Sequence, residues 1–359
     1  MERRIVSIAL RYRFFVVLAI ALIAGWGVYA YRQLPIDAFP DISPIMVPIF
    51  AEAHGMAPEE IERLITFPIE SAMNGLPGVA QVKSTSAAGM AVVYVYFSDD
   101  TDIYFARQIV AERLGQAMAE LPELHEPPKL GPIATGLGQI FMYYLTLAPN
   151  ADTEGKDAGT YLREINDWIV KYQLRTVPGV TDILSMGGFV LQYEIRINPH
   201  ALDKYGLSIA QVVEAVRANN RNAGGQFLLL GSEEYNIRGV GLLQSLEDIR
   251  GVQIAVRNGA PIRIGDVAEV AYGRETRRGV VTRNGAGEVV TGIVLQLFGE
   301  NTSKVIASLY RTIPAVQASL PPGVRLVPYY EQAELVRKAT RTVIDALWQG
   351  ALLVIIILT

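Results

Sequence analysis

Apolar residues gather at both ends of the chain. Residues 14–31 read FFVVLAIALIAGWGVYAY and contain no charged side chain. A helix of this length spans about 27 Å, close to the hydrocarbon thickness of a bilayer. The residues before it include Arg3, Arg4, Arg11 and Arg13 but one acid, Glu2, and such a basic flank stays on the cytoplasmic side. The pattern therefore predicts a cytoplasmic N-terminus followed by a transmembrane helix.

The second apolar stretch, residues 346–359, reads ALWQGALLVIIILT. It is too short to cross a bilayer alone. Two interpretations are open: a buried terminal helix, or the start of a second membrane helix. We favour the second because no cap or polar turn closes the stretch. For residues 14–31 the alternative is a cleaved signal peptide with a motif at 28–30, although the apolar run exceeds a usual signal core.

Between these stretches one pattern recurs three times: an amphipathic helix, Pro-Gly-Val, and an alternating strand. The triplets occupy 77–79, 178–180 and 322–324. In the second copy the helical period places Ile165, Trp168, Ile169 and Tyr172 on one apolar face, and a proline followed by glycine ends the helix. A further helix is expected over 104–120. Strands separated by helices in this way predict an α+β fold built from ferredoxin-type βαβ subdomains.

The pattern changes over residues 183–270. A turn-forming run, NNRNAGG, occupies 219–225 between longer β-type stretches. We expect a separate subdomain here with a protruding hairpin. A protruding arm that cannot bury its own apolar side chains usually packs on a partner chain.

Composition excludes several classes of function. The net charge of −4 provides no basic field for nucleic acid, and the chain has no cysteine for a disulfide or a thiolate site. Its three histidines, His54, His125 and His200, are far apart in sequence. No P-loop, GxSxG or HExxH motif is present. We therefore expect neither an enzyme nor a bound cofactor.

Two further groups of residues have structural interpretations. Asp99, Asp100 and Asp102 are predicted to form a solvated turn that caps the following helix. The methionines are scattered, and those on β-type stretches, Met90, Met142 and Met186, are interpreted as core filling. Thioether sulfur is a soft ligand suited to Cu(I), but no close methionine pair is evident in the sequence.

The residues after the first apolar stretch carry a family resemblance. Residues 34–41 read LPIDAFPD, and further motifs follow as TFPIE (66–70), MNGLP (73–77), DIYFAR (102–107), GPIATG (131–136), YGLS (205–208) and RRG (277–279). Together they resemble the resistance–nodulation–division (RND) efflux permeases, and more specifically their heavy-metal-efflux branch, the copper/silver and cobalt/zinc/cadmium pumps. The resemblance covers essentially all of the chain and about a third of such a permease.

The resemblance implies a division of the chain. It gives a cytoplasmic N-terminus (1–13), a transmembrane helix (14–31), a first porter subdomain (32–132), a second porter subdomain in two parts (133–182 and 271–335), a docking subdomain between them (183–270) and the start of a second transmembrane helix (336–359). The docking subdomain would send a hairpin that includes Asn222, Gly224 and Gly225 into the neighbouring protomer of a homotrimer.

The resemblance also implies a function. The chain would be the N-terminal part of a proton-driven permease of the bacterial inner membrane, with a large periplasmic region. It would export heavy-metal cations through a periplasmic adaptor protein and an outer-membrane channel, and lipid would surround its helices. The family's proton-coupling carboxylates lie on a later helix, and residues 14–31 contain no acid.

Gln139 and Met142 are the residues expected nearest the substrate. In zinc-type members a glutamate occupies the position of Gln139, and a neutral amide is a weaker ligand for a hard or borderline cation. The family's Tyr-Asp-Arg before the second membrane helix is Tyr330-Glu331-Gln332 here. These departures leave the metal unknown, and both candidates also fit an ordinary strand.

Two rival functions stay open at this point. One is an RND pump for drugs or other organic substrates, whose apolar site would use Phe141, Tyr143, Tyr144 and Phe189. The other is a membrane-tethered periplasmic binding module.

Overall fold

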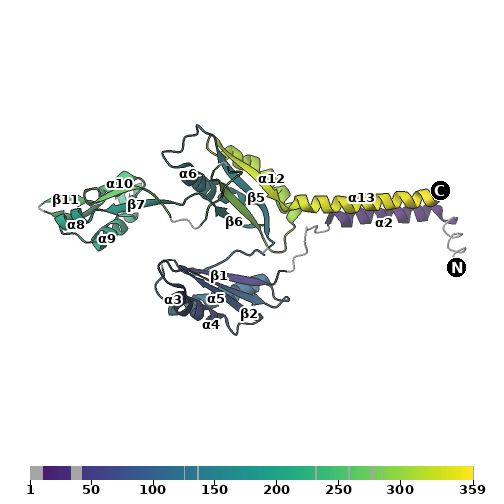
Figure 1. Cartoon of the computed structure of the whole chain (residues 1–359), viewed down its shortest axis with the longest axis horizontal. Coiled ribbons are helices and arrows are strands. Elements are labelled where there is room, and N and C mark those ends of the chain that lie inside the picture. Colours follow the sequence, from purple (N-terminus) through teal and green to yellow (C-terminus); the bar gives the residue numbers. More distant parts are fainter. Residues whose placement is uncertain are drawn as a thin grey trace.

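Two four-stranded antiparallel sheets form the body of the protein (Figure 1). The computed structural model describes residues 11–33, 43–124, 126–135, 137–230, 233–257, 259–275, 279–285 and 287–358. The residues 34–41 that open the family motif lie outside the described part. The sheets belong to a first sheet unit, residues 44–131, and a second sheet unit, residues 139–188 together with 287–331.

The first sheet unit follows a βαββαβ path. Its elements are β1 (Met46–Glu52), the continuous helical segment α3 (Pro58–Ile61), η1 (Glu62–Thr66) and α4 (Phe67–Met73), then β2 (Val79–Ala87), β3 (Met90–Phe97), α5 (Ile103–Ala117) with η2 (Met118–Glu120), and β4 (Lys129–Leu130). The strand order is β2-β3-β1-β4. Apolar side chains at alternate strand positions, such as Val47, Ile49 and Val93, are buried beneath the helices.

The second sheet unit repeats this path. It consists of β5 (Gln139–Leu147), the segment α6 (Ala158–Ile165), η3 (Asn166–Val170) and α7 (Lys171–Leu174), β6 (Val180–Met186), β13 (Val290–Gln296), α12 (Thr302–Ser319) and β14 (Val324–Glu331). Its order, β14-β5-β13-β6, is that of the first sheet when strands are matched along the chain. The α+β class with ferredoxin-type subdomains, predicted from the sequence, is confirmed.

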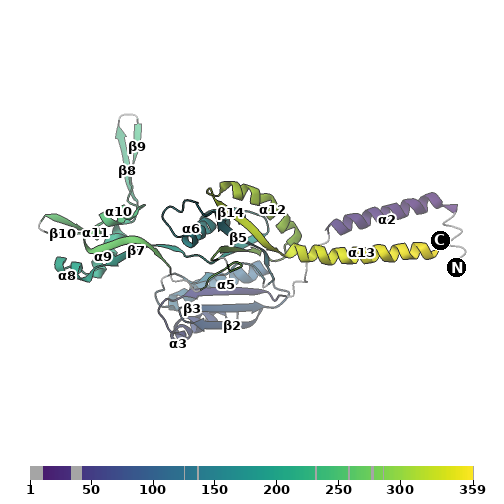
Figure 2. The same ribbon diagram turned by 45° about the horizontal axis from the view of Figure 1, so that its top comes forward.

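A third unit is inserted between β6 and β13 and has its own small core. This inserted unit, residues 191–274, contains β7 (Leu191–Ile197), α8 (Pro199–Tyr205), α9 (Ile209–Asn219), β8 (Ala223–Leu230), β9 (Glu233–Gly239), α10 (Leu246–Gly251), β10 (Gln253–Arg257), β11 (Ala260–Arg263), α11 (Ile264–Val267) and β12 (Ala268–Arg274). The paired strands β7 and β12 connect it to the second sheet unit. The hairpin β8–β9 projects away from the other elements, as the sequence predicts (Figure 2).

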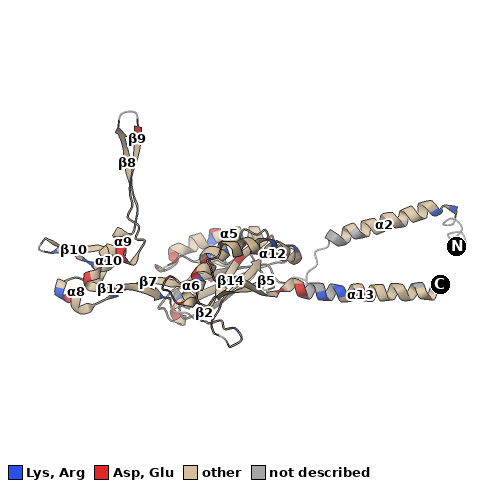
Figure 3. Ribbon diagram, turned by 90° about the horizontal axis from the view of Figure 1, so that it is seen from above, with Lys and Arg blue, Asp and Glu red and all other residues tan. Residues whose placement is uncertain are grey.

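Two long helices, α2 (Arg13–Gln33) and α13 (Gln332–Leu358), project from the opposite end of the body in the same direction (Figure 2). The chain runs inward along α2 and outward along α13. The charged residues of α13 gather near the body, and residues 346–358 carry none (Figure 3). Across the residues that the structure describes, no helix combines the length and the apolar character needed to cross a membrane.

The local signals of the repeat are confirmed. The glycine of each Pro-Gly-Val triplet adopts a left-handed φ: 77° at Gly78, 86° at Gly179 and 89° at Gly323. Glycine is favoured there because a Cβ destabilises this conformation. Asp102 caps α5 as predicted, since its carboxylate accepts a hydrogen bond of 2.8 Å from the amide of Phe105.

One predicted helix face is wrong. Trp168 and Tyr172 are exposed, and their rings stack on each other at 6.1 Å, whereas Ile165, Val170 and Leu174 enter the core. The reason is the π-helical turn η3, which adds a residue to the turn and rotates the following side chains away from the α-helical phase. The first sheet unit has a π-helical turn, η1, at the corresponding place.

Candidate functional site

The face of the second sheet that points away from its helices carries two methionines and two tyrosines. Because side chains alternate across a strand, burial of Phe141 and Tyr143 against the helices turns Met142 and Tyr144 to the other face. In the register of the sheet Met142 lies opposite Ile293, which lies opposite Leu184 on β6. One step along, Tyr144 lies in the same row as Thr291 and Met186. We call this surface the open sheet face.

Met142 is held on the open sheet face by aromatic neighbours. The hydroxyl of Tyr329, on β14, lies 3.5 Å from the sulfur of Met142, and its ring lies 5.9 Å from the ring of Tyr144. The guanidinium of Arg283 covers the Tyr144 ring at 4.6 Å. A thioether in this position is half-buried but reachable, so it can act as a weak acceptor or as a soft ligand.

Gln139 has a different setting from Met142. It is the exposed first residue of β5, and its register partner is Leu295 next to a β-bulge. The structure therefore puts both predicted residues on one strand, at different depths. Met186, which the sequence assigned to the core, is 47% exposed. That interpretation is wrong because Ser185, not Met186, points toward the helices of the unit.

A polar network lies under the sheet, on its helical side. The Tyr143 hydroxyl donates to Asn166 Oδ1 at 2.8 Å, and Asn166 Nδ2 donates to Ser185 Oγ at 2.8 Å. Ser185 donates in turn to Asp167, which also accepts from Arg163 Nε at 2.7 Å. Burial, and then the charge of Asp167, raise the pKa of Tyr143 far above its ordinary value, so this hydroxyl stays protonated and serves as a donor.

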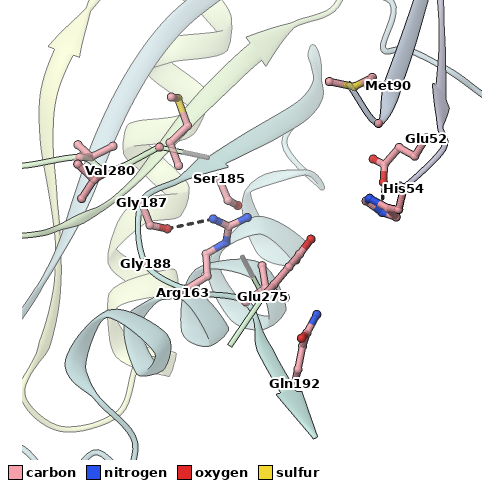
Figure 4. Close-up of a pocket in the computed structure, with 15 residues that line it drawn as sticks. Glu52, His54, Met90, Arg163, Ser185, Gly187, Gly188, Gln192, Glu275 and Val280 are labelled. Carbon is pink, nitrogen blue, oxygen red and sulfur yellow. Dashed lines mark hydrogen bonds and ion pairs between the residues drawn. The ribbon is translucent and has the colours of Figure 1, made fainter. Parts of the chain in front are cut away.

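Arg163 links this network to a cleft between the two sheet units. The cleft has a volume of about 700 Å³ (Figure 4). Its first wall consists of residues of the first sheet unit, among them Glu52, His54 and Met90. The facing wall includes Arg163, whose guanidinium donates to the carbonyl of Gly187 at 3.0 Å, and Met186 at the edge of the open sheet face.

The cleft could not be predicted from the sequence, because its walls come from segments far apart in the chain: 52–90, 163–192 and 275–281. The turn at 88–89 pairs Met90 with Ala87 of β2, whereas Glu52 lies opposite Met90 through the long-range pairing of β1 with β3. Within the described residues no three histidine or acidic side chains converge in a way that could hold a metal ion.

The predicted hairpin residues lie at the base of β8–β9. Asn222 Oδ1 accepts a hydrogen bond of 3.1 Å from the amide of Gly241, and Asn220 Oδ1 accepts one of 3.2 Å from Leu243. Gly224 follows on β8 opposite Arg238. These side-chain bonds join the two segments at the base of the hairpin. The outer part of the hairpin projects beyond them (Figure 2).

Known proteins resemble this chain in both sequence and fold. The model of the AcrB/AcrD/AcrF family matches residues 5–359. The cation efflux system protein CzcA of Alcaligenes sp. (strain CT14) is 42% identical over 100% of this chain and 34% of its own length. The cation efflux system protein CusA of Escherichia coli (strain K12) is 38% identical over 91% of this chain and 31% of its own length.

A crystal structure of a heavy metal efflux pump superposes with a TM-score of 0.86 at 31% identity, and covers 96% of this chain and 34% of its own. The chain thus spans about a third of the length of the curated relatives that it matches. The motifs predicted such a resemblance, and the match extends through both sheet units and the inserted unit. The chain belongs to the AcrB/AcrD/AcrF family of RND transporters.

Proposed function

We propose that this chain is the N-terminal part of a proton-driven efflux permease that exports heavy-metal cations. The names of its relatives support the substrate class. The family is one of transporters, which also favours transport over catalysis. Proton coupling requires acidic groups within the membrane; it is inferred from the family resemblance, and we assign it to the part of the permease outside this chain.

The permease would lie in the bacterial inner membrane, with α2 and the outer part of α13 among its membrane helices. The uncharged stretches 14–31 and 346–358 and the basic residues before the first support this placement. The two sheet units would then be periplasmic porter subdomains and the inserted unit a docking subdomain. We propose a homotrimer that acts with a periplasmic adaptor protein and an outer-membrane channel.

The observation that carries the substrate proposal is the pair of accessible thioethers on the open sheet face. Met142 and Met186 lie on neighbouring rows of that face and carry no charge. Sulfur donors select soft cations such as Cu(I) and Ag(I), whereas the neutral Gln139 offers little to a hard cation. We therefore propose that the open sheet face, with Met142 and then Gln139, borders the cation path.

A tolerance assay tests this proposal. The full-length permease carrying this chain is expressed, with its adaptor and channel, in a strain that lacks metal pumps. Growth is measured in silver, copper, zinc and cobalt salts. We expect tolerance to at least one of these metals, and we expect Met142→Leu to reduce tolerance to silver and copper ions while retaining the fold.

Met118→Leu is the matched control, because Met118 is 40% exposed but lies on η2 of the first sheet unit. It should leave tolerance unchanged. No tolerance to any of the four metals would contradict the proposed function. Equal tolerance in the Met142→Leu variant and the parent would remove Met142 from the cation path.

An organic substrate is the second candidate, and one observation favours it. Tyr144 and Tyr329 give the open sheet face an aromatic character that suits apolar molecules. However, Phe141 and Tyr143 are fully buried under the sheet, and Phe189 is covered by the guanidinium of Arg274 at 4.8 Å. Of the four aromatic residues that this alternative predicts, only Tyr144 lies on the open sheet face, so we rank metal cations first.

A further inference from the structure

Three side chains with different donor atoms line one wall of the cleft. Glu52 ends β1 and Met90 begins β3, and the two residues are direct partners in the antiparallel register. Cross-strand partners have Cβ atoms about 4.5–5.5 Å apart on the same face. His54 follows Glu52 by two residues, and its Nε2 lies 3.5 Å from Glu52 Oε2. Figure 4 shows Met90 beside this pair.

The backbone that carries these side chains is fixed. The amide of Ala53 donates to the carbonyl of Gly89 at 2.9 Å, and the amide of Gly89 donates to the carbonyl of Met56 at 3.3 Å. These bonds tie the segment with His54 to the turn that precedes Met90. The backbone positions of the three residues are therefore fixed relative to one another, and their side chains line the open cleft.

The separation of the imidazole and the carboxylate suits a shared metal ion. Zinc binds histidine nitrogen at about 2.0–2.1 Å and carboxylate oxygen at about 2.0–2.2 Å. Two such ligands at a tetrahedral angle lie about 3.4 Å apart, close to the 3.5 Å between Nε2 and Oε2. An ion between the two atoms would need only a small rotation of either side chain.

Two cationic residues among the described surroundings of this pair, Lys129 and Arg163, are bonded to other groups. Lys129 interacts with the charge of Glu52, but its ammonium is bonded to Glu126. On the facing wall, the guanidinium of Arg163 is bonded to Asp167 and Gly187. Both Glu52 and His54 have side chains more than half exposed, so an incoming ion does not have to displace buried groups. The facing wall adds a carboxylate, Glu275, and a thioether, Met186.

We infer that Glu52, His54 and Met90 form a binding site for a borderline transition-metal cation, such as Zn²⁺ or Co²⁺, in the cleft between the sheet units. Oxygen, nitrogen and sulfur donors together suit this class better than magnesium or calcium. The site belongs to the first sheet unit, across the cleft from Met186 at the edge of the open sheet face, and it makes the cleft a place where a cation can be held. The identity of the ion as cargo rests on the proposed function, but its binding does not.

Metal binding to the purified chain in detergent tests this inference. Calorimetry with Zn²⁺ measures affinity, and Co²⁺ reports the ligand field through its visible absorption. We expect one site in the parent protein. His54→Ala and Glu52→Gln should each weaken Zn²⁺ binding by about tenfold or more, since removal even of groups behind a ligand costs 10–100-fold. Met90→Leu should change the Co²⁺ spectrum.

His200→Ala is the matched control, because His200 is an exposed histidine on α8 of the inserted unit. It should bind Zn²⁺ as the parent does, and circular dichroism with a thermal melt should show that all variants fold. Unchanged affinity in both His54→Ala and Glu52→Gln would overturn the site. If Zn²⁺ binds through His54 but the full-length permease confers no metal tolerance, the proposed function fails and the site stands.

Discussion

At the scale of single residues, Asn166 determines whether the buried hydroxyl of Tyr143 has a partner. Asn166→Ala removes the acceptor at 2.8 Å and leaves a hydroxyl in a fully buried position. An unpaired buried polar group costs about 1–3 kcal/mol, so we expect a loss of stability in that range. Chemical denaturation measures it.

The partner substitution is an internal check on that prediction. Tyr143→Phe removes the hydroxyl, so Asn166→Ala should cost less in the Tyr143→Phe background than alone. Additive losses in this double-mutant cycle would mean that the bond contributes nothing.

The packing around Gly292 leaves no space for a side chain at this position. A Cβ built on Gly292 would lie 2.2 Å from the ring of Tyr143, the register partner of Gly292 on the neighbouring strand. The large ring fills the space above this glycine, so Gly292→Ala should destabilise the second sheet unit by about 1–3 kcal/mol through overpacking. Thermal unfolding by differential scanning calorimetry measures the change.

Gly115→Ala provides the contrast for this substitution. Gly115 lies in α5, where a Cβ meets nothing within 4 Å. Alanine is favoured over glycine inside a helix by about 1 kcal/mol. This variant should therefore be as stable as the parent or more so, and equal destabilisation by the two substitutions would show that Tyr143 is not the cause.

At the scale of elements, the start of α6 should make stability depend on pH. Asp157 caps α6, and its carboxylate also pairs with Arg274 of β12 at 3.1 Å. Partial burial acts to raise the pKa of Asp157, but hydrogen bonds from Thr160 and the charge of Arg274 outweigh burial and lower it. A carboxyl with a lowered pKa stabilises the fold above its unfolded pKa of about 3.9, and this contribution disappears as the pH falls through the folded pKa.

Asp157→Asn should remove this pH-dependent contribution while an amide oxygen keeps the cap. We expect the variant to be less stable than the parent by about 0.5–1 kcal/mol at pH 7, since the group is partly exposed. The difference should shrink toward zero below about pH 4. Urea unfolding at several pH values measures it, and a difference that is constant with pH would mean that the cap alone matters.

The same scale shows what the sequence could predict and what it could not. The Pro-Gly-Val triplets identified three helix ends because proline and a left-handed glycine act locally. The sequence prediction puts Trp168 on the wrong face because it assumes the α-helical period throughout, whereas the structure has a π-helical turn that begins at Asn166. The position of Met186 likewise follows from a long-range contact, the bond between Ser185 and Asn166.

At the scale of the whole molecule, the fold class of each sheet unit was predictable and the cleft was not. Each sheet is assembled from one βαββαβ segment, so local patterns indicate its class even across the insertion between β6 and β13. The cleft joins residues of two such segments, and no local pattern specifies how two independently formed cores face each other. His54 therefore looked isolated in sequence although it lies beside two other possible ligands.

The hairpin β8–β9 leads to a prediction about assembly. Its outer part exposes Phe227, Leu229 and Tyr235 to solvent, and Leu229 is 72% exposed. Exposed apolar side chains on a projecting arm favour burial against another chain. Leu229→Lys should therefore disfavour the proposed trimer of the full-length permease, because burying an unpaired ammonium at an interface is unfavourable.

Val256→Lys is the control that separates this effect from added charge. Val256 is 58% exposed on β10, which forms the other hairpin of the inserted unit with β11. Light scattering of the detergent-solubilised permease should show monomers for Leu229→Lys and trimers for Val256→Lys. Trimers in both variants would place the interface elsewhere, and loss of trimers in both would assign the whole inserted unit, rather than β8–β9 alone, to assembly.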